Sequence, residues 1–200
     1  PETSLSKSRP INRAPPLPAS STSISSIHRW LPVFTYTTSR AITEAYDTAT
    51  TNVTPFKAFV GQGYSMRINV TVINKGDFTE TFSVTVYANT TVIETREVTL
   101  TGGNSATVTF TWSTAGLARY QNYTISAYAW PVPGETSTGD NNLPDGVITV
   151  TYPGDINGDR VVDGLDISPL ARAFGSYPGD PKYRPVLDIN DDDFIDGLDI

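Results

Sequence analysis

The chain has 200 residues, with 14 Lys and Arg against 21 Asp and Glu, one His and no Cys, which gives a net charge of −7. This length allows one or two domains, and the absence of Cys excludes both a disulfide framework and thiol chemistry. No apolar run approaches the roughly 18 residues that a membrane-spanning helix needs, so we expect no membrane span in this fragment.

The charge is distributed unevenly along the chain. Residues 1–45 carry a net charge of +3, residues 46–152 carry −3, and residues 153–200 carry −7. The basic part is sparse and poor in aromatic residues, so we expect no nucleic-acid partner. The opposite charges of the two ends would favour head-to-tail association of identical chains.

Residues 1–45 are predicted to form a Pro-, Ser- and Thr-rich extended arm. Its first part lacks apolar periodicity, which is typical of segments that do not build a core of their own. Residues 27–42 are richer in apolar and β-prone side chains. Two interpretations remain open for them: a linker with an apolar patch, or a strand added to this chain's own domain or to a neighbouring copy. The candidate partner-binding residues of the second interpretation are Trp30, Val33, Phe34 and Tyr36.

Residues 46–152 show the pattern of an all-β domain. Met66, Ile68, Val70 and Val72 alternate with polar residues, as in a half-buried strand, and a turn signal follows at residues 74–77. Similar runs, separated by turns about every ten residues and by no helix, predict a mainly β, immunoglobulin-like Greek-key sandwich. The predicted strands are 49–59, 66–72, 82–86, 92–100, 106–112, 123–130 and 147–152.

Several short runs recur across this stretch as a recognisable set. They are VGQGY at 60–64, NVTV at 69–72, NKG at 74–76, FSVTVY at 82–87, TVTFTW at 107–112, and GET at 134–136 leading to DNN at 140–142. With these runs the stretch resembles the CARDB family, a group of prokaryotic, cell-adhesion-related sandwich domains. The resemblance implies a non-catalytic surface or spacer module.

Two further features of this stretch bear on ligands. Trp112 and Trp130 are expected in the core rather than on the surface as platforms for sugar rings. Four Asn-X-Ser/Thr sequons mark candidate glycosylation sites, with one expected on the solvent face of its strand and one at a turn. Asn69 is the one expected on the solvent face of its strand, Asn89 is the one expected at a turn, and the other two are Asn52 and Asn122.

Residues 153–200 contain one acidic pattern written twice, GDINGDRVVDGLDI from Gly154 and LDINDDDFIDGLDI from Leu187. Both copies place oxygen-bearing side chains at positions 1, 3, 5, 9 and 12 of a 12-residue loop, where side chains turn inward around calcium and position 7 adds a backbone carbonyl. So many protein oxygens suit calcium better than magnesium. The predicted ligands of two calcium ions are Asp155, Asn157, Asp159, Val161, Asp163 and Asp166 in loop 1, and Asp188, Asn190, Asp192, Phe194, Asp196 and Asp199 in loop 2.

The local structure of the loops follows from the same alignment. Position 6 favours Gly because its backbone is left-handed, yet it holds Arg160 in loop 1 and Asp193 in loop 2. Asp tolerates that conformation better than Arg, so we expect the more regular backbone in loop 2. Val162 and Ile195 at position 8 are expected to pair across a short two-stranded bridge. A helix is expected after loop 1 and before Gly175, and the chain is expected to continue beyond residue 200 into a second helix.

With two loops, a following helix and Asp at position 12, residues 153–200 resemble the dockerin family. The resemblance implies calcium binding and docking onto a cohesin-like domain, with contact residues at loop positions 10 and 11. At position 11 these are Leu165 and Leu198, each preceded by Gly. The junction Pro153-Gly154 is too short for a flexible linker, so we expect the loops and the sandwich to keep a fixed relation.

The sequence contains little material for catalysis. The single histidine, His28, lies in the arm, which argues against a Ser-His-Asp triad or a zinc cluster. The paired carboxylates fall within the calcium loops, where the metal accounts for them. We therefore expect no enzymatic activity.

Three functional hypotheses follow. The first is an extracellular, calcium-binding structural or adhesive protein whose copies assemble into a cell-surface filament or layer, with extracellular calcium stabilising a chain that has no disulfides. The second is a dockerin-type binding module that forms the tail of a larger secreted enzyme. In the third, the calcium module docks onto its own sandwich and contributes only stability.

Overall fold

The computed structural model describes residues 45–199, so the predicted arm and its candidate residues Trp30, Val33, Phe34 and Tyr36 lie outside the described part of the chain. Within residues 45–199 there are eight strands, one α-helix and one short 3-10 helix. They are β1 (Thr48–Pro55), β2 (Phe59–Gly61), β3 (Ser65–Asn74), β4 (Glu80–Ala88), β5 (Thr91–Leu100), β6 (Ser105–Ser113), β7 (Asn122–Ala129), β8 (Asn142–Thr151), α1 (Gly164–Ala173) and η1 (Pro185–Leu187).

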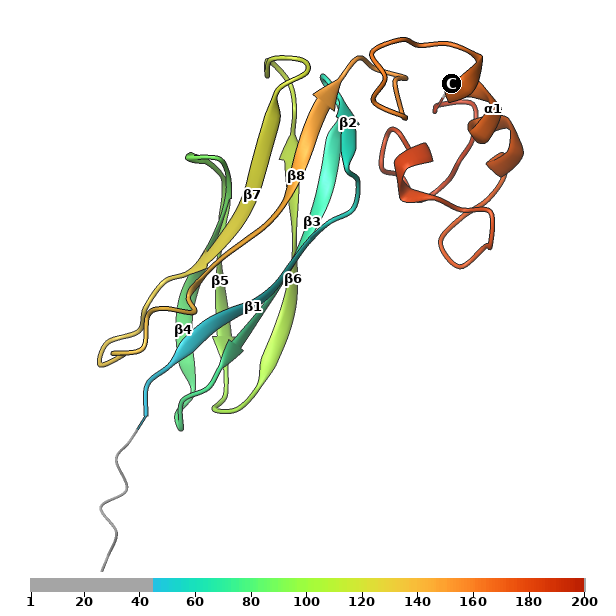
Figure 1. Ribbon diagram of the computed structural model, residues 1–200. Coiled ribbons are helices and arrows are strands. Elements are labelled where there is room, and N and C mark those ends of the chain that lie inside the picture. The colour runs from blue at the N-terminus through green and yellow to red at the C-terminus, as the bar shows by residue number, and fades with distance from the viewer. Residues whose placement is uncertain (1–44, 200) are drawn as a thin grey trace, which may run out of the picture. The chain divides into compact units, whose positions relative to one another are not determined.

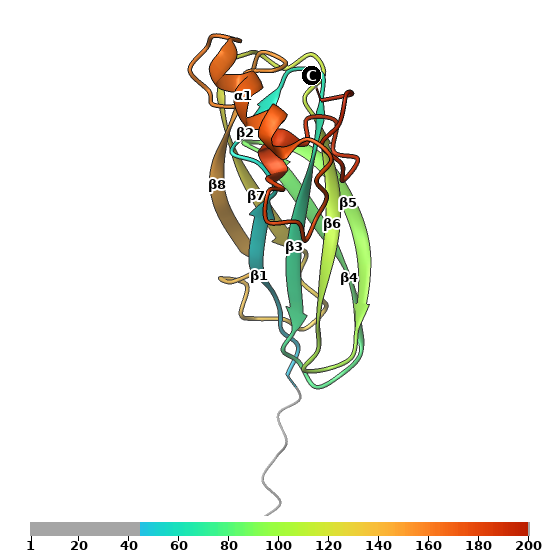
Figure 2. The same ribbon diagram turned by 90° about the vertical axis from the view of Figure 1, so that its right-hand side faces the viewer.

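The strands form two sheets that pack face to face (Figure 1 and Figure 2). One sheet has the strand order β1-β3-β6, and the other has the order β2-β8-β7-β4-β5. All neighbouring strands pair antiparallel except β2 and β8, which run parallel from Phe59 opposite Thr149 to Gly61 opposite Thr151. The mainly β, immunoglobulin-like sandwich predicted from the sequence is confirmed.

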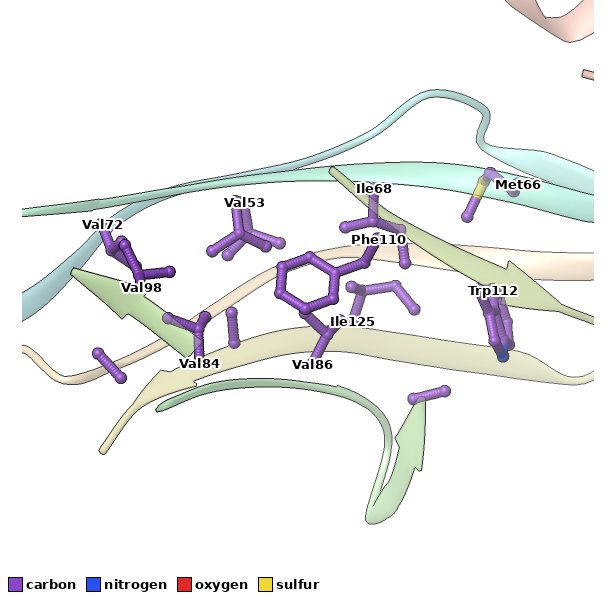
Figure 3. Packing of buried hydrophobic residues seen from close by; sticks show 14 of the residues in the cluster. Val53, Met66, Ile68, Val72, Val84, Val86, Val98, Phe110, Trp112 and Ile125 are labelled. Carbon is purple, nitrogen blue, oxygen red and sulfur yellow. The ribbon is translucent and has the colours of Figure 1, made fainter. Parts of the chain in front are cut away.

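Apolar side chains that alternate along the strands fill the space between the sheets. On β3, Met66, Ile68, Val70 and Val72 are fully buried, while the residues between them are half-buried. Figure 3 shows Phe110 of β6, also fully buried, among side chains from both sheets. Full burial of one such side chain stabilises a fold by about 1.5–3 kcal/mol, so this interface is the main source of stability in the sandwich.

Two buried asparagines tie loops to the ends of the sandwich. Asn74 is fully buried, and its Nδ2 donates to the backbone oxygens of Phe78 (2.7 Å) and Leu100 (2.9 Å). Asn141, also fully buried, donates from Nδ2 to Glu135 Oε1 (2.8 Å). Because a buried polar group is costly without a partner, these bonds fix the connections that the two asparagines reach.

The first predicted strand, 49–59, is two strands. β1 ends at Pro55, which has no N–H to continue the ladder, and β2 then joins the other sheet beside β8. The last strand also differs from its prediction. β8 begins at Asn142 instead of Val147, because its pairing with β7 continues past an irregularity between Thr124 and Ile125.

The two tryptophans differ in burial. Trp112 is buried in the core as predicted, whereas the prediction for Trp130 is wrong, since Trp130 is 49 % exposed. Trp130 lies directly after β7, its Nε1 donates to Thr85 Oγ1 (2.9 Å), and its ring meets Tyr128 edge-on. The indole N–H of Trp130 thus has a hydrogen-bond acceptor in the Thr85 hydroxyl, and the ring stays half exposed at the surface.

The C-terminal part contains helix α1 and a small apolar cluster of its own. Asp163 is the N-cap of α1 and forms a capping box with Asp166, and Gly175 (φ +80°) follows the helix end as predicted. The cluster consists of Leu170, Ala173, Leu187 and Ile195. In the part of the chain that the structure describes, no helix is long and apolar enough to cross a membrane.

Candidate metal centre

The carboxylates at loop positions 1 and 12 accept hydrogen bonds from the backbone of their own loops, most of them at equivalent positions. At position 1, Asp155 Oδ2 accepts from Arg160 N (3.1 Å) and Asp188 Oδ2 accepts from Asp193 N (3.0 Å), which is position 1 to position 6 in each loop. The position-12 carboxylates accept from the N–H groups of positions 2, 3 and 9 in both loops. All four position-1 and position-12 carboxylates are buried. The duplicated spacing in the sequence is therefore a duplicated structure.

The side chains at positions 3, 5 and 9 also act alike in the two loops. Each accepts, through its side-chain oxygen, the N–H of the residue two places further on, at distances from 2.7 to 3.1 Å. These are Asx turns, in which an Asn or Asp side chain bonds the backbone two residues on and so bends the chain tightly. The residues concerned are Asn157, Asp159, Asp163, Asn190, Asp192 and Asp196.

Positions 4 and 6 hold the left-handed backbone that winds each loop. The φ angles are +78° and +80° at Gly158 and Arg160 in loop 1, and +67° and +71° at Asp191 and Asp193 in loop 2. The expected left-handed position 6 is present in both loops. Arg160 adopts it as fully as Asp193 does, so the expected advantage of loop 2 is not observed.

The residues at positions 7 and 8 are less alike. Val161 and Phe194 at position 7 are about half exposed, at 54 % and 53 %. At position 8, Val162 is 50 % exposed while Ile195 is fully buried, and the backbone of Ile195 bonds to residues 175 and 176. The predicted bridge between Val162 and Ile195 is replaced by this contact, which seats Ile195 in the apolar cluster beside α1.

The donors of the loops fit a hard cation in their chemistry. Within residues 45–199, no three His, Cys, Asp or Glu side chains already converge on one point as metal ligands. Asp155 and Asp188 instead accept one loop N–H at each carboxylate oxygen, and Asp188 Oδ2 also accepts from the Tyr183 hydroxyl (2.7 Å), so Asp188 Oδ1 is the less occupied of its two oxygens. A carboxylate oxygen has a second lone pair, so these buried groups keep capacity for a cation. Oxygen ligands of this kind are those that calcium takes.

The candidate partner-binding residues of the two loops are open to solvent. Leu165 is 66 % exposed and Leu198 is 69 % exposed. Each lies at position 11 of its loop, and each backbone N–H donates to the position-9 carboxylate of the same loop. The two leucines therefore stand at equivalent, rigidly held places in the two copies.

The four sequons differ in exposure. Asn52, Asn89 and Asn122 are exposed, and Asn89 lies at the turn between β4 and β5 with φ of +55°. Asn69 is half-buried on β3, and its Oδ1 accepts from Thr109 Oγ1 (2.7 Å). Glycosylation of these residues stays a prediction.

Two basic residues of the sandwich lie against loop 2, and the sequence analysis missed both. Arg67 donates from Nη1 and Nη2 to Asp193, which lowers the pKa of that carboxyl, and the same bond raises the pKa of Arg67. Lys57 is 5 % exposed, and burial lowers the pKa of its ammonium. No local signal identifies either residue, because Arg67 occupies an ordinary outward position of an alternating strand and Lys57 lies between strands.

Comparison with known proteins matches two parts of this structure to families. The model of the CARDB family matches residues 48–131, and that of the dockerin type I domain matches residues 153–200. The chain combines a CARDB segment with a dockerin type I segment. Both resemblances noted in the sequence are thereby confirmed. No match was found among curated proteins.

Several solved structures are similar to about half of this chain. A CARDB domain from Pyrococcus furiosus, crystallised in complex with di-metal ions, is 22 % identical, with a TM-score of 0.46 over 55 % of this chain and 96 % of that chain. A domain of a candidate cell-surface protein from Methanosarcina acetivorans is 23 % identical, with a TM-score of 0.43 over 53 % of this chain and 92 % of that chain. A β-glucosidase from Erythrobacter marinus is 18 % identical, with a TM-score of 0.41 over 53 % of this chain and 16 % of that enzyme. None of these matches bears on the activity of the chain.

The two families give the coarse function. CARDB and dockerin segments are non-catalytic modules that are typical of extracellular or cell-surface proteins. Dockerin type I domains bind calcium and imply binding to a cohesin-like partner.

Proposed function

We propose that the chain is a non-catalytic extracellular module that binds two calcium ions and attaches through its dockerin segment to a cohesin-like domain. The CARDB segment then serves as the adhesive or spacer part. The observation that supports this most is the hydrogen-bond pattern that loops 1 and 2 share. The side chains at positions 3, 5, 9 and 12 accept from equivalent N–H groups in both loops, and the position-1 carboxylate accepts from position 6 in both.

Each calcium ion would be held by the side chains at positions 1, 3, 5, 9 and 12 and by the backbone carbonyl at position 7, which belongs to Val161 or Phe194. The ion supplies positive charge that offsets the mutual repulsion of four carboxylates in each loop. The loop residues themselves set the backbone turns through the hydrogen bonds of their side chains to the loop backbone. Calcium binding then stabilises the folded segment by mass action, because the extended chain offers no such arrangement.

The cohesin-like partner would contact the equivalent surfaces around Leu165 and Leu198. Both leucines are two-thirds exposed, so a partner that covers them would remove apolar surface from water, which favours association. Their duplication supports a partner that is able to use either copy. A single exposed leucine is common on protein surfaces. The support for a partner surface is that two leucines occupy equivalent positions of the two loops.

Binding to type I cohesin domains tests this function. We expect the full chain to bind at least one member of a cohesin panel in calcium and to lose that binding in chelator, measured by calorimetry. The double variant Leu165→Asp/Leu198→Asp should weaken binding at least about 10-fold. The matched control is Val147→Asp, at an apolar residue of the sandwich that is 53 % exposed. Undiminished binding of the double variant would contradict the assigned surface.

Self-assembly into a fibre or layer is a second candidate function. The opposite charges of the chain ends and the β-prone residues of the predicted arm favour it. Within residues 45–199, β5 forms one edge of the five-stranded sheet and has an unpaired side to which another strand can add. Deleting residues 1–45 should then reduce the oligomer size measured by light scattering, and an unchanged size would remove this candidate.

In a glycosylating host, glycans at the four sequons would add mass detectable by mass spectrometry.

A further inference from the structure

Side-chain contacts of loop 2 with Arg67 of the sandwich come from positions 4 and 6, which carry no predicted ligand. Arg67 of β3 donates to both carboxylate oxygens of Asp193 at position 6, with Nη1 3.0 Å from Oδ2 and Nη2 2.5 Å from Oδ1. Arg67 Nε lies 3.0 Å from Oδ2 of Asp191 at position 4, as an ion pair without the alignment of a hydrogen bond. One guanidinium thus holds both outward acidic groups of loop 2.

Lys57 holds the beginning of the same loop. Its ammonium donates to the backbone oxygen of Asp188, lies 3.4 Å from that of Ile189, and is 3.8 Å from Asp191 Oδ1. The side chain of Lys57 is 3 % exposed and that of Asp191 is 7 % exposed. A buried ammonium group is costly unless oxygen atoms accept its hydrogen bonds or carry the opposite charge. Within the described chain, all the oxygen partners of Lys57 belong to loop 2.

Loop 1 touches the sandwich through the same two positions with different chemistry. At position 4, Gly158 lies so close to Phe59 of β2 that an added Cβ would be 2.3 Å from a ring carbon. At position 6, the guanidinium of Arg160 lies 5.0 Å from the ring centre of Tyr120, and its backbone oxygen accepts a long hydrogen bond (3.4 Å) from the Tyr120 hydroxyl. Equivalent places in both loops therefore face the sandwich.

These contacts explain why position 6 departs from Gly in both loops. Arg160 and Asp193 have φ angles of +80° and +71°, a backbone conformation that costs free energy for any residue with a Cβ. A glycine would remove that cost and also the side chain that reaches Tyr120 or Arg67. Strained residues persist where the surrounding contacts stabilise them, and here those contacts lie on the other segment.

We propose that positions 4 and 6 of the two loops form an intramolecular docking surface, held by Lys57 and Arg67 of the CARDB segment, that makes the sandwich and the dockerin segment one rigid body. It follows that calcium affinity at loop 2 depends on the sandwich. Docking holds the backbone of loop 2 in its wound form, and a calcium ion binds the same form. Docking therefore raises the calcium affinity of loop 2 by the same factor by which calcium raises the equilibrium constant for docking. The docking part rests on the contacts described above, whereas the coupling part rests on the proposed calcium binding.

Backbone ¹⁵N relaxation of the full chain in calcium tests the docking. We expect residues 48–151 and 155–199 to show one rotational correlation time. In the double variant Lys57→Met/Arg67→Met, residues 155–199 should tumble faster than the sandwich. The matched control, Arg96→Met, removes an arginine whose ion pair with Glu94 lies within β5, so it should behave as the parent. Independent tumbling in the parent chain, or no change in the double variant, would overturn the proposal.

A second variant separates docking from folding. Asp193→Gly removes the loop side of the Arg67 contact while giving position 6 the residue best suited to its backbone. We expect this variant to stay folded, to tumble in two parts and to bind calcium more weakly at one of two sites, about 5- to 20-fold by calorimetry. Equal or tighter calcium binding with unchanged tumbling would contradict the proposal. Absence of calcium binding in the parent chain would contradict the proposed function, while the relaxation result would still decide the docking.

Discussion

The CARDB sandwich and the dockerin segment are stabilised in different ways. The apolar cluster of the sandwich contains 20 buried residues, and that of the dockerin segment contains four. Burial of four side chains does not offset the conformational entropy lost by a segment of this length, whereas a core of 20 does so for a small domain. The dockerin segment therefore needs a second source of free energy.

That second source is polar. The loops are wound by side chain to backbone hydrogen bonds, and these bonds gather four carboxylates in each loop. Without a cation, these carboxylates repel one another and destabilise the fold. One segment is thus predicted to be stable by itself and the other only with calcium.

Removing calcium should separate the two segments most strongly. With a chelator in excess, we expect the amide resonances of residues 155–199 to lose their dispersion while those of residues 48–151 stay dispersed and shift only near the docking contacts, measured by ¹⁵N correlation spectra. Adding magnesium instead of calcium is the control and should restore much less structure, because magnesium prefers a smaller octahedral site. Spectra that stay the same in chelator would contradict the comparison.

A cavity in the sandwich should have the converse effect. Phe110→Ala removes a fully buried ring between the sheets and should lower the free energy of unfolding of the sandwich by about 3–5 kcal/mol. Urea unfolding followed by tryptophan fluorescence measures this loss. Calcium affinity of the folded variant should stay within about twofold, since calcium stabilises a different segment. A Phe110→Ala sandwich as stable as the parent would show that the core is not where its stability lies.

Loss of a buried polar contact should cost less than loss of the core ring. Asn141→Ala leaves Glu135 Oε1 without its donor, so we expect a destabilisation of about 1–3 kcal/mol in the same urea assay. Asn142→Ala, at an exposed neighbouring position, is the control and should change stability by less than about 0.5 kcal/mol. Equal free energies of unfolding for the two variants would contradict a stabilising role of the Asn141 hydrogen bonds.

The smallest effect is expected at an exposed ion pair. The hydrogen bond to Asp140 raises the pKa of Lys75 above its unfolded value of 10.5. The pair therefore contributes its whole stabilisation at pH values below 10.5, and this stabilisation is lost as the pH rises through the folded pKa. Both side chains are more than a third exposed, so screening limits the contribution to about 0.5 kcal/mol or less. Lys75→Met should therefore hardly change urea midpoints at pH 7, and a loss above about 1 kcal/mol would contradict this assignment.

Much of both segments could be predicted because their patterns are local. The alternation from Met66 to Val72 gives the buried face of β3, and the repeated ligand spacing gives loops whose hydrogen bonds match one another. The position of Gly175 after α1 follows from capping rules in the same way.

The features that could not be predicted depend on distant residues. The chain changes sheets after Pro55 because β8 offers β2 a partner nearly 90 residues away. Trp130 stays at the surface because Thr85 accepts its N–H. Arg67 looks like any outward residue of an alternating strand, and only the folded chain brings it to Asp193. Local pattern contains no information on such contacts.

The number of calcium ions bound per chain tests the central claim most directly. Native mass spectrometry of the full chain in calcium should show two bound ions, one fewer in Asp155→Ala or Asp188→Ala, and none in the double variant. A parent chain that binds no calcium at millimolar concentration would contradict the account.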